Sequence, residues 1–286
     1  MKHIVVYTSD MHGNETQYEK LMAYSRQIHA DSIIIGGDIA PKDSVENFIS
    51  NQRHFLQDRL PYFLSKKEKN TKVFLILGND DCMANEDIIQ GNKLYSVIHK
   101  KRVQLTRDFD MVGYSHVPIT PFKLKDWEKF DFNDVPKHLA TEYELRKKTN
   151  YGLDGFKSTT ADWKEFLFQP RDEQDSIQKD LSQDLFKKDS RKTIYVIHTP
   201  PNQTNLDMIM NGSHVGSMAV KLFIEECQPY LTLHGHIHET VYMSGDFRAQ
   251  IGDTLSLASG NHNIGSDLAV IVFDIYNPQS ATRHIL

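Results

Sequence analysis

The sequence predicts an α/β protein built on a partly parallel sheet. Short apolar runs such as residues 4–7 are rich in β-branched side chains, as expected of strands that are buried on both faces. Segments with helical spacing of apolar residues alternate with these runs, and this alternation is typical of right-handed βαβ units. The early runs end abruptly in Asp or Asn beside glycine. Since functional groups gather at the carboxyl ends of parallel strands, we expect a site at that edge.

The first expected strand, residues 3–7, leads into the polar sequence Thr8-Ser9-Asp10-Met11-His12-Gly13. Side chains two apart on an extended strand share a face, so Asp10 and His12 can point at the same object. A carboxylate and an imidazole that converge at a strand end suit a divalent metal better than a core. Taken alone, Asp-x-His is more often an ordinary polar strand end. Asn14 can cap the helix that follows, which should run to about His29.

The second and third expected strands repeat this arrangement. Residues 32–36 end in Gly36-Gly37-Asp38, and residues 72–77 end in Gly78-Asn79-Asp80-Asp81. Between them we expect an amphipathic helix that closes near Pro61, since proline interrupts a helix. The apolar face of this helix is marked by Val45, Phe48, Ile49, Phe55 and Leu56.

The middle of the chain is less regular. Residues 103–114 predict one or two short strands, and about 115–190 predict a helical insertion that lies over or beside the sheet. One helical face there is marked by Ile177, Leu181, Leu185 and Phe186. Two interpretations stay open: a lid over the site, or a surface excursion without chemistry.

The aromatic residues of the insertion follow the same alternatives. In a lid, some of them would line the mouth of the site and stack on a base or an aryl group. Otherwise they would form the insertion's own small core. The candidates are Phe122, Trp127, Tyr151 and Trp163, with Phe122 and Trp127 favoured as substrate contacts.

Regular structure returns in the last third of the chain. A strand at 192–197 should end in His198-Thr199-Pro200-Pro201, and one at 229–233 in His234-Gly235-His236-Ile237-His238. The helix between them is marked by Val215, Met218, Ala219, Leu222 and Phe223. Further strands are expected at 240–243, 254–258 and 268–275, with a turn at Asn277-Pro278. Without internal repeats or a low-complexity linker, we expect one domain over residues 1–286.

Composition excludes several classes of protein. With 286 residues, 25% charged and 39% hydrophobic, the chain is typical of a soluble globular protein with a sizeable core. A net charge of -5 argues against a general nucleic-acid binder. Cys82 and Cys227 are the only cysteines, which leaves no disulfide framework or thiolate metal site.

No apolar run approaches the roughly 20 residues of a membrane span. The chain enters a strand at once, without room for a signal peptide, so we expect a cytoplasmic location and no membrane partner. The oligomeric state has no sequence signal.

Seven side chains at or just beyond the expected strand ends form a candidate metal site. They are Asp10, His12, Asp38, Asn79, His198, His236 and His238. Oxygen and imidazole nitrogen ligands suit Mn, Fe, Co or Zn better than Ca or Mg. Seven groups exceed what one ion with an open position needs, so we expect two metal ions. A histidine pair two residues apart can reach two ions that lie about 3.5–4 Å from each other, as in two-metal hydrolytic sites.

These ordered motifs resemble those of the calcineurin-like metallophosphoesterase family. They cover the chain from residue 1 to about 240. The resemblance implies a four-layer α/β/β/α sandwich in which the later strands form a second sheet. It implies that one metal is held by Asp10, His12 and His238. The other would be held by Asn79, His198 and His236, and Asp38 would bridge both.

The resemblance also implies an activity, that of a phosphodiesterase or phosphatase. A metal-bound hydroxide would attack the phosphorus of a phosphate ester in line, and nucleotide-like esters are among the candidate substrates. The alternative is a non-catalytic metal-binding scaffold or interaction module on the same fold. Retention of the full ligand set favours the enzyme.

One motif departs from the family, which usually reads Gly-Asn-His-Asp or Gly-Asn-His-Glu. Here Asp80 stands at the position of the histidine. That histidine is thought to protonate the leaving group or to bind a phosphoryl oxygen, and an ionised Asp80 would do neither well. Burial beside Asp81 could keep Asp80 protonated and make it the acid, but nearby metals oppose this. We favour the ionised form.

Overall fold

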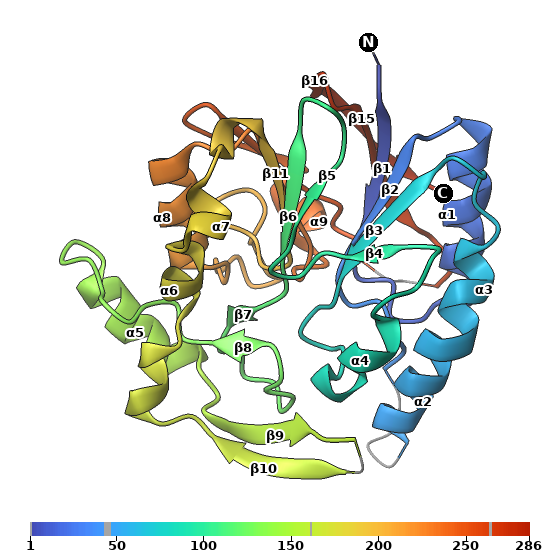
Figure 1. Ribbon diagram of the computed structural model, residues 1–286. Helices are drawn as coiled ribbons and strands as arrows, with labels where there is room; N and C mark the ends of the chain where they lie inside the picture. Colours follow the sequence, from blue (N-terminus) through green and yellow to red (C-terminus); the bar gives the residue numbers. More distant parts are fainter. Residues whose placement is uncertain (1, 43–46, 161, 263–264) are drawn as a thin grey trace.

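The computed structural model describes residues 2–42, 47–160, 162–262 and 265–286. Two six-stranded sheets pack face to face, and helices cover the outer face of each sheet (Figure 1). This is the expected four-layer α/β/β/α sandwich. Over the described residues, no helix has the length and apolar character needed to cross a membrane.

The first sheet joins the two ends of the chain. β1 to β4 are mutually parallel, and β15 and β16 extend the sheet in antiparallel fashion. The carboxyl ends of β1, β2 and β3 therefore lie at one edge. In spatial order the strands are β16 (Asn277–Ile285), β15 (Ala269–Asp274), β1 (Ile4–Thr8), β2 (Ser32–Gly36), β3 (Lys72–Ile76) and β4 (Ser96–Val97).

The second sheet has four parallel inner strands and an antiparallel strand at each edge. Its inner strands also end toward the insertion (Figure 1). In spatial order the strands are β13 (Arg248–Ile251), β14 (Thr254–Ala258), β12 (Leu231–His234), β11 (Thr193–Ile197), β6 (Asp110–Tyr114) and β5 (Arg102–Gln104).

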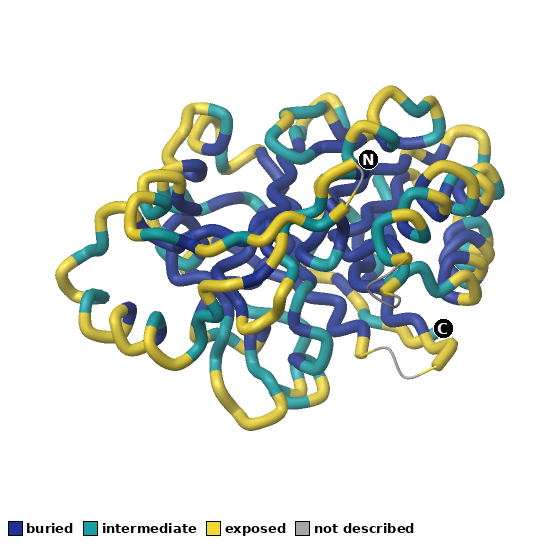
Figure 2. Tube along the Cα trace, turned by 90° about the horizontal axis from the view of Figure 1, so that it is seen from below, coloured by how far each residue is buried: buried dark blue, intermediate teal, exposed yellow. Residues whose placement is uncertain are grey.

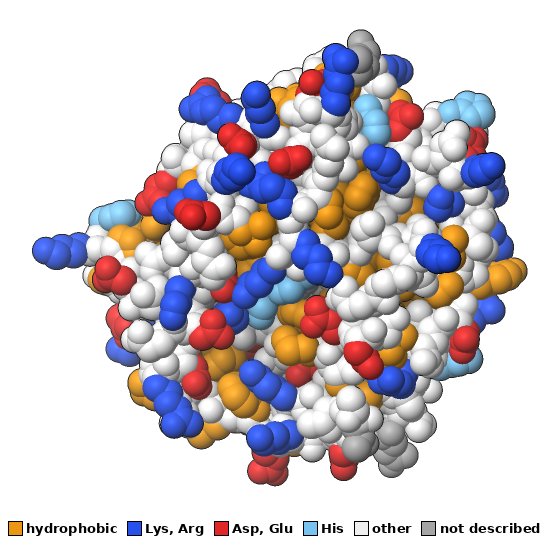
Figure 3. All heavy atoms as spheres, viewed as in Figure 1, with side chains coloured by type: hydrophobic (Ala, Val, Ile, Leu, Met, Phe, Trp, Pro, Cys, Tyr) orange, Lys and Arg blue, Asp and Glu red, His pale blue; other side chains and the backbone are white. Residues whose placement is uncertain are grey.

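Alternating side chains of the first sheet supply two separate cores. Val6, Ile33 and Ile35 face the helices, whereas Val5 and Ile34 face the second sheet. Both sets are buried, which is why these strands read as continuous apolar runs rather than as alternating ones. Figure 2 shows the buried tube running through the middle of the molecule, with the exposed segments around it. On the face drawn in Figure 3, acidic and basic side chains are interspersed over the surface that covers these cores.

The helices on the first sheet are α1 (Glu15–Gln27) and a long helical segment made of α2 (Phe48–His54), a π-helical turn (Phe55–Arg59) and α3 (Leu60–Leu64). Asn14 caps α1 as expected, because its side chain accepts the backbone N–H of Gln17 at 3.2 Å. The expected end near Pro61 is wrong. A π-helical turn precedes Pro61, and the helix continues past the proline to Leu64. Val45 lies outside the described residues.

The second sheet is covered by α6 (Ile177–Leu181), α7 (Asp184–Lys187) and α8 (Met218–Cys227). Val215, which was expected in the last of these helices, precedes it. The expected strand at 240–243 is wrong, since α9 (Thr240–Ser244) occupies these residues. The expected turn at Asn277-Pro278 is also wrong, because these residues begin β16.

The insertion lies beyond the carboxyl ends of both sheets (Figure 1). It is not only helical, since β9 and β10 pair as an antiparallel hairpin. Its elements are β7 (Val117–Pro118), β8 (Glu128–Lys129), α5 (Ala140–Asn150), β9 (Asp154–Ser158) and β10 (Trp163–Leu167). The same stretch of the chain also contains α6, α7 and the 3-10 turn Pro170–Gln174. Further short helical segments are α4 (Glu86–Ile89) and the 3-10 turns Met83–Asn85 and Ser190–Lys192.

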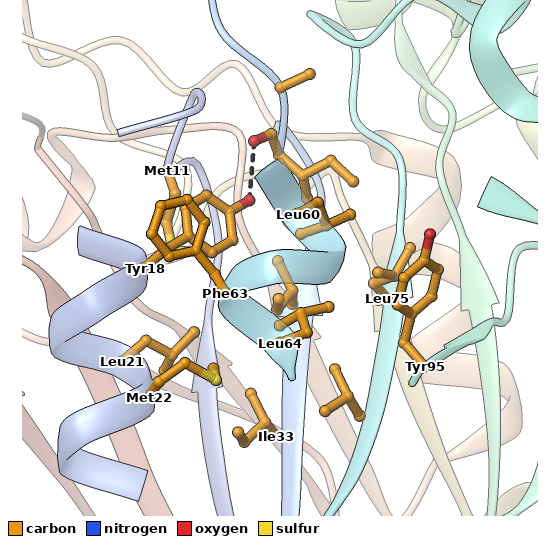
Figure 4. Packing of buried hydrophobic residues seen from close by; sticks show 14 of the residues in the cluster. Met11, Tyr18, Leu21, Met22, Ile33, Leu60, Phe63, Leu64, Leu75 and Tyr95 are labelled. Atoms are coloured by element: carbon orange, nitrogen blue, oxygen red, sulfur yellow. Dashed lines mark hydrogen bonds between the residues drawn. The ribbon is translucent and has the colours of Figure 1, made fainter. Parts of the chain in front are cut away.

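Tyr18 joins α1 to the loop that follows β2. Its ring packs against Phe55 and Phe63. Its hydroxyl donates to the carbonyl of Ile39 at 2.8 Å, the dashed line in Figure 4. This loop carries Asp38, one of the expected metal ligands. The hydroxyl therefore fixes part of the candidate site from within the hydrophobic core.

Replacing Tyr18 by Phe should lower the free energy of unfolding by about 1 kcal/mol, because the change removes one buried hydrogen bond and keeps the ring. Urea denaturation measures this change. Tyr242→Phe is the control, because Tyr242 is 73% exposed. Equal losses in the two variants would contradict a buried bond at Tyr18.

Candidate metal centre

The two sheets bring all seven expected ligands to one place, the seam at their carboxyl ends. The first sheet supplies four of them and the second sheet three. Two backbone hydrogen bonds join the loops that follow β1 and β2. The N–H of Asp10 donates to the backbone carbonyl of Gly37 at 3.0 Å, and the N–H of His12 donates to that of Asp38 at 2.9 Å. Across the seam, the N–H of His236 donates to the carboxylate of Asp10 at 2.9 Å.

Asp10, His12, Asp38 and His238 form one compact group. One ligand atom from each lies within 4.8 Å of the others. The Nε2 atoms of His12 and His238 are 3.2 Å apart, and His238 Nε2 is 3.6 Å from Asp10 Oδ1. Three of these residues are the ones that the family resemblance assigns to one metal.

Asn79, His198 and His236 form the adjoining group. Asn79 Oδ1 is 3.1 Å from His198 Nε2 and 2.6 Å from His236 Nδ1. Asp38 lies between the two groups, with its Oδ2 3.9 Å from His12 Nε2 and 3.4 Å from His198 Nε2. One carboxylate can therefore reach both ligand sets.

Unusual backbone geometry aims these side chains. Asp10, His12, Asp38 and His236 have φ of 58°, 44°, 52° and 68°, in the left-handed region that residues with a side chain seldom adopt. Each such residue costs about 1–3 kcal/mol, and such costs are concentrated at functional sites.

Two glycines allow the loops to approach one another. A Cβ on Gly78 would lie 2.2 Å from Asp38 Oδ1, and one on Gly37 would lie 2.5 Å from His198 Nδ1. Gly37 also has φ of +104°. Side chains at these positions would displace two of the expected ligands, which explains the Gly-Asp and Gly-Asn pairs in chemical terms.

Asp81 fixes two of these loops to each other. Its buried carboxylate accepts the N–H groups of Gly78 and Ala40, each at 2.9 Å, and that of Ile39 at 3.1 Å. Burial and the charge of Asp38 raise the pKa of Asp81 to about 7, against the effect of these hydrogen bonds. The loops that carry Asp38 and Asn79 therefore share one anchor. In the sequence, only the motif position of Asp81 indicates this role, and it was not among the expected site residues.

The charges at the site call for a cation. Burial lowers the pKa of His12 to about 4, so that imidazole is neutral and able to bind a metal. Burial also lowers the pKa of His198, but the carboxylate of Asp38 outweighs it and raises that pKa to about 9. The carboxylate of Asp38 thus favours positive charge at His198, and a metal ion bound between the two side chains would supply that charge instead of a proton. The Nδ1 of His198 is 2.7 Å from the carbonyl of Gly36, which leaves Nε2 toward the site. The donor set and its charge fit two divalent ions.

A cleft of about 420 Å³ opens over the metal centre. One wall is apolar and includes Phe122, which is 57% exposed. The guanidinium of Arg146 donates to the carbonyls of Val215 and Gly216, which ties α5 to the segment that precedes α8. The other lining residues are Asp38, Lys42, Asn79, Asp80, Pro118, Ile119, Thr120, Pro121, Thr149, Asn150, Ile209, Asn211, Ser213, His236, Ile237, His238 and Glu239.

The structure separates the four aromatic candidates. Phe122 lines the cleft, but Trp127 does not: it is 1% exposed in the core beside the first sheet, and its Nε1 donates to the carbonyl of Asp81 at 2.8 Å. The expectation that Trp127 contacts substrate is therefore wrong. Tyr151 packs in the core of the insertion, and Trp163 packs against Phe48, away from the cleft lining.

Lys42 is a further residue of the cleft that sequence reasoning missed. Its Nζ lies 2.5 Å from Asp80 Oδ2. No local pattern marks this lysine, because its partner comes from another loop. Burial and the charge of Asp38 raise the pKa of Asp80 to about 6, against the opposing effect of Lys42. Asp80 is thus mainly ionised at neutral pH.

The model of the family described as calcineurin-like phosphoesterase matches residues 4–240. The chain belongs to this family. The match spans both sheets' ligand-bearing loops, from β1 to the residues just after His238. No curated protein sequence matches the chain significantly.

Solved structures share the fold of this family member at low sequence identity. One has a TM-score of 0.59 at 15% identity over 99% of each chain. Protein TT1561 of Thermus thermophilus has a TM-score of 0.52 at 13% identity over 99% of each chain. A dimetal phosphatase from Danio rerio has a TM-score of 0.51 at 11% identity over 95% of each chain. These likenesses show the fold.

Manganese should stabilise the metal-free protein. At a free concentration of 100 times Kd, a ligand adds about 2.7 kcal/mol, or about 5–10 °C in Tm for a chain of this size. Metal binding at His198 must displace its proton, so the gain should increase as the pH rises toward about 9, the pKa of that imidazole. Scanning calorimetry at several pH values measures this gain.

Asp38→Asn should lower the occupancy of both ions, because a neutral amide oxygen is a poor bridge. His238→Ala should weaken mainly the ion shared with Asp10 and His12. Asp267→Asn is the control, since its carboxylate is 72% exposed and pairs with Lys20. Elemental analysis that finds two ions per chain in Asp38→Asn, with the full gain in Tm, would contradict the bridging role.

Proposed function

We propose that this protein hydrolyses phosphate esters with two divalent metal ions. The position of Asp38 carries this proposal, since its Oδ2 faces His12 on one side and His198 on the other. A scaffold that bound a single ion would not need a carboxylate between two complete ligand sets. The dimetal phosphatase named among the structures of similar fold supports the same stoichiometry.

The ligand assignment follows from the two groups of side chains. Asp10, His12 and His238 would hold one ion, and the second ion would be held by Asn79, His198 and His236. Manganese, iron, zinc and cobalt all suit this set of oxygen and nitrogen donors. When bound, such ions polarise phosphoryl oxygens and lower the pKa of water.

The chain's own residues would position the ester. Asn79 and His236 line the cleft, so the phosphoryl group would lie beside them, next to the ligand sets. The organic group would then extend along the apolar wall that includes Phe122 and Pro121. A flat aryl group or a nucleobase fits such a wall, because it can stack on an aromatic ring. We therefore favour aryl or nucleotide-like esters.

The leaving group separates the candidate substrates. Expulsion of an alkoxide needs a proton, and a positioned general acid contributes about 10²–10⁴-fold. Asp80 replaces the usual histidine, and its pairing with Lys42 favours the ionised carboxylate. The enzyme should accordingly prefer esters of acidic alcohols, which leave without protonation. Simple alkyl monoesters should react slowly.

With added manganese, the protein should hydrolyse a generic aryl phosphodiester or monoester, and His236→Ala should lower kcat/KM by about 10- to 100-fold or more, because it removes a proposed ligand of one ion. A colorimetric assay of aryl release measures both. Metal binding without turnover of any aryl ester would instead favour a non-catalytic scaffold.

Phe122→Ala should raise KM for an aryl ester about 5- to 150-fold, in line with stacking worth about 1–3 kcal/mol, with kcat little changed. Leu167→Ala is the matched control, since Leu167 is 53% exposed on the insertion and lies outside the cleft lining. An unchanged KM in Phe122→Ala would refute the stacking contact.

A further inference from the structure

A lysine from a neighbouring loop occupies the surroundings of the missing motif histidine. Lys42 follows β2, four residues after Asp38, and its ammonium lies 2.5 Å from the carboxylate of Asp80. Both residues line the cleft together with Asp38, Asn79 and His238. The substitution of histidine by aspartate therefore brings a cation to the phosphoryl end of the cleft.

Asp80 is held firmly enough to fix its partner. Its backbone N–H donates to Asp38 Oδ1 at 2.8 Å, and its carbonyl accepts from Gln52 Nε2 at 2.7 Å. Gln52 is itself fully buried, and its Oε1 accepts the N–H of Cys82 at 2.7 Å. Because both of its backbone polar groups are hydrogen-bonded, the backbone of Asp80 is fixed in position, and so is the start of its side chain. Its carboxylate can then hold Lys42 in one place.

The ammonium stays charged in this setting. Burial lowers the pKa of Lys42, but the carboxylates of Asp80 and Asp38 outweigh it and raise the pKa above its ordinary value. An ammonium has three donors. Within the described ranges, Asp80 is its one hydrogen-bond or ion-pair partner. Donors therefore remain for a ligand in the cleft.

Stability gives little reason for this ion pair. The side chain of Lys42 is 49% exposed, and that of Asp80 is 18% exposed. Ion pairs that are open to solvent contribute little to the free energy of unfolding. A carboxylate alone beside a phosphoryl group would repel it. The Lys42–Asp80 pair therefore matters more for the charge that a ligand meets in the cleft than for the stability of the fold.

We propose that Lys42 binds a phosphoryl oxygen of the substrate and that Asp80 is the positioning residue that holds Lys42 in place. The ammonium thereby supplies the positive hydrogen-bond donor that the motif histidine would otherwise supply. This inference rests on the proposed phosphoesterase function, and it assigns binding of the phosphoryl group, without a proton transfer, to Lys42. Asp80 acts only through Lys42.

Inorganic phosphate is the probe for this contact, because it shares the charged oxygens of the substrate. Isothermal calorimetry on the manganese-loaded protein should give a Kd that is about 10- to 100-fold higher for Lys42→Met, as expected for loss of a charge-assisted hydrogen bond. Lys42→Arg should recover most of the affinity. The KM of an aryl ester should rise in parallel, while metal content and Tm stay unchanged.

Lys123→Met is the matched control. Lys123 also pairs with an aspartate at 2.5 Å, that of Asp154, but it lies outside the cleft lining. This variant should bind phosphate as the unaltered protein does. Equal phosphate affinity in Lys42→Met and Lys123→Met would overturn the proposal.

The role of Asp80 needs a double-mutant cycle. If Asp80 positions Lys42, Asp80→Asn should weaken phosphate binding in the presence of Lys42 and should not weaken it in Lys42→Met. If Asp80 only repels phosphate, Asp80→Asn should strengthen binding in both backgrounds, which would refute the positioning role. Asp80→His in the Lys42→Met background restores the usual motif and should recover the lost affinity.

The two proposals fail in different ways. Absence of aryl ester turnover, with phosphate binding that still depends on Lys42, would refute the enzyme and keep the anion contact. Normal turnover with no effect of Lys42→Met on Kd or KM would refute the anion contact and keep the enzyme.

Discussion

Aspartates approach one another where β1, β2 and β3 end, and their negative charge has to be balanced for this end of the sheet to pack. Asp10, Asp38 and Asp81 are buried. Each has a different form of compensation. Backbone N–H groups surround Asp81, the imidazole of His198 faces Asp38, and that of His238 lies beside Asp10. Since buried charges are costly without partners, this balance decides which loop conformations are possible.

The compensation also explains why the ligands come from both sheets. The loops after the first sheet contribute two carboxylates, one amide and one imidazole, and those after the second sheet contribute three imidazoles, so the carboxylates come only from the first sheet and most of the imidazoles from the second. The core between the sheets, which includes Val5 and Ile34, sets the distance across which the two kinds of ligand meet. Packing at the centre of the sandwich is thus connected to chemistry at its end.

The sequence predicts the parts of this arrangement that have a local signal. Buried parallel strands carry continuous apolar runs, so β1, β2 and β3 and the polar residues after them were evident. The helix at Thr240–Ser244 was not predicted, because Thr, Val and Tyr favour strands. In the structure these residues form a helical turn that Gly245 closes in the left-handed conformation.

Other features depend on partners that are distant in the sequence. Trp127 was expected at the cleft, but the carbonyl of Asp81 gives its indole N–H a buried partner and so lets the ring enter the core. The place of Lys42 in the cleft could not be predicted, because its partner Asp80 lies on another loop and only the folded structure brings the two together. The π-helical turn before Pro61 has no sequence pattern of its own. The one-domain organisation stays a prediction.

The separation of the ligands along the chain has a consequence for how this protein matures. His12 and His238 are 226 residues apart in the sequence, yet their Nε2 atoms are 3.2 Å apart. Closing so long a loop costs entropy that only the assembled sandwich repays. A chain still emerging during synthesis would lack a complete ligand set until β12 had joined the second sheet. The ligand sets would therefore be complete only after the second sheet had packed on the first, so assembly of the site would be among the last steps of folding.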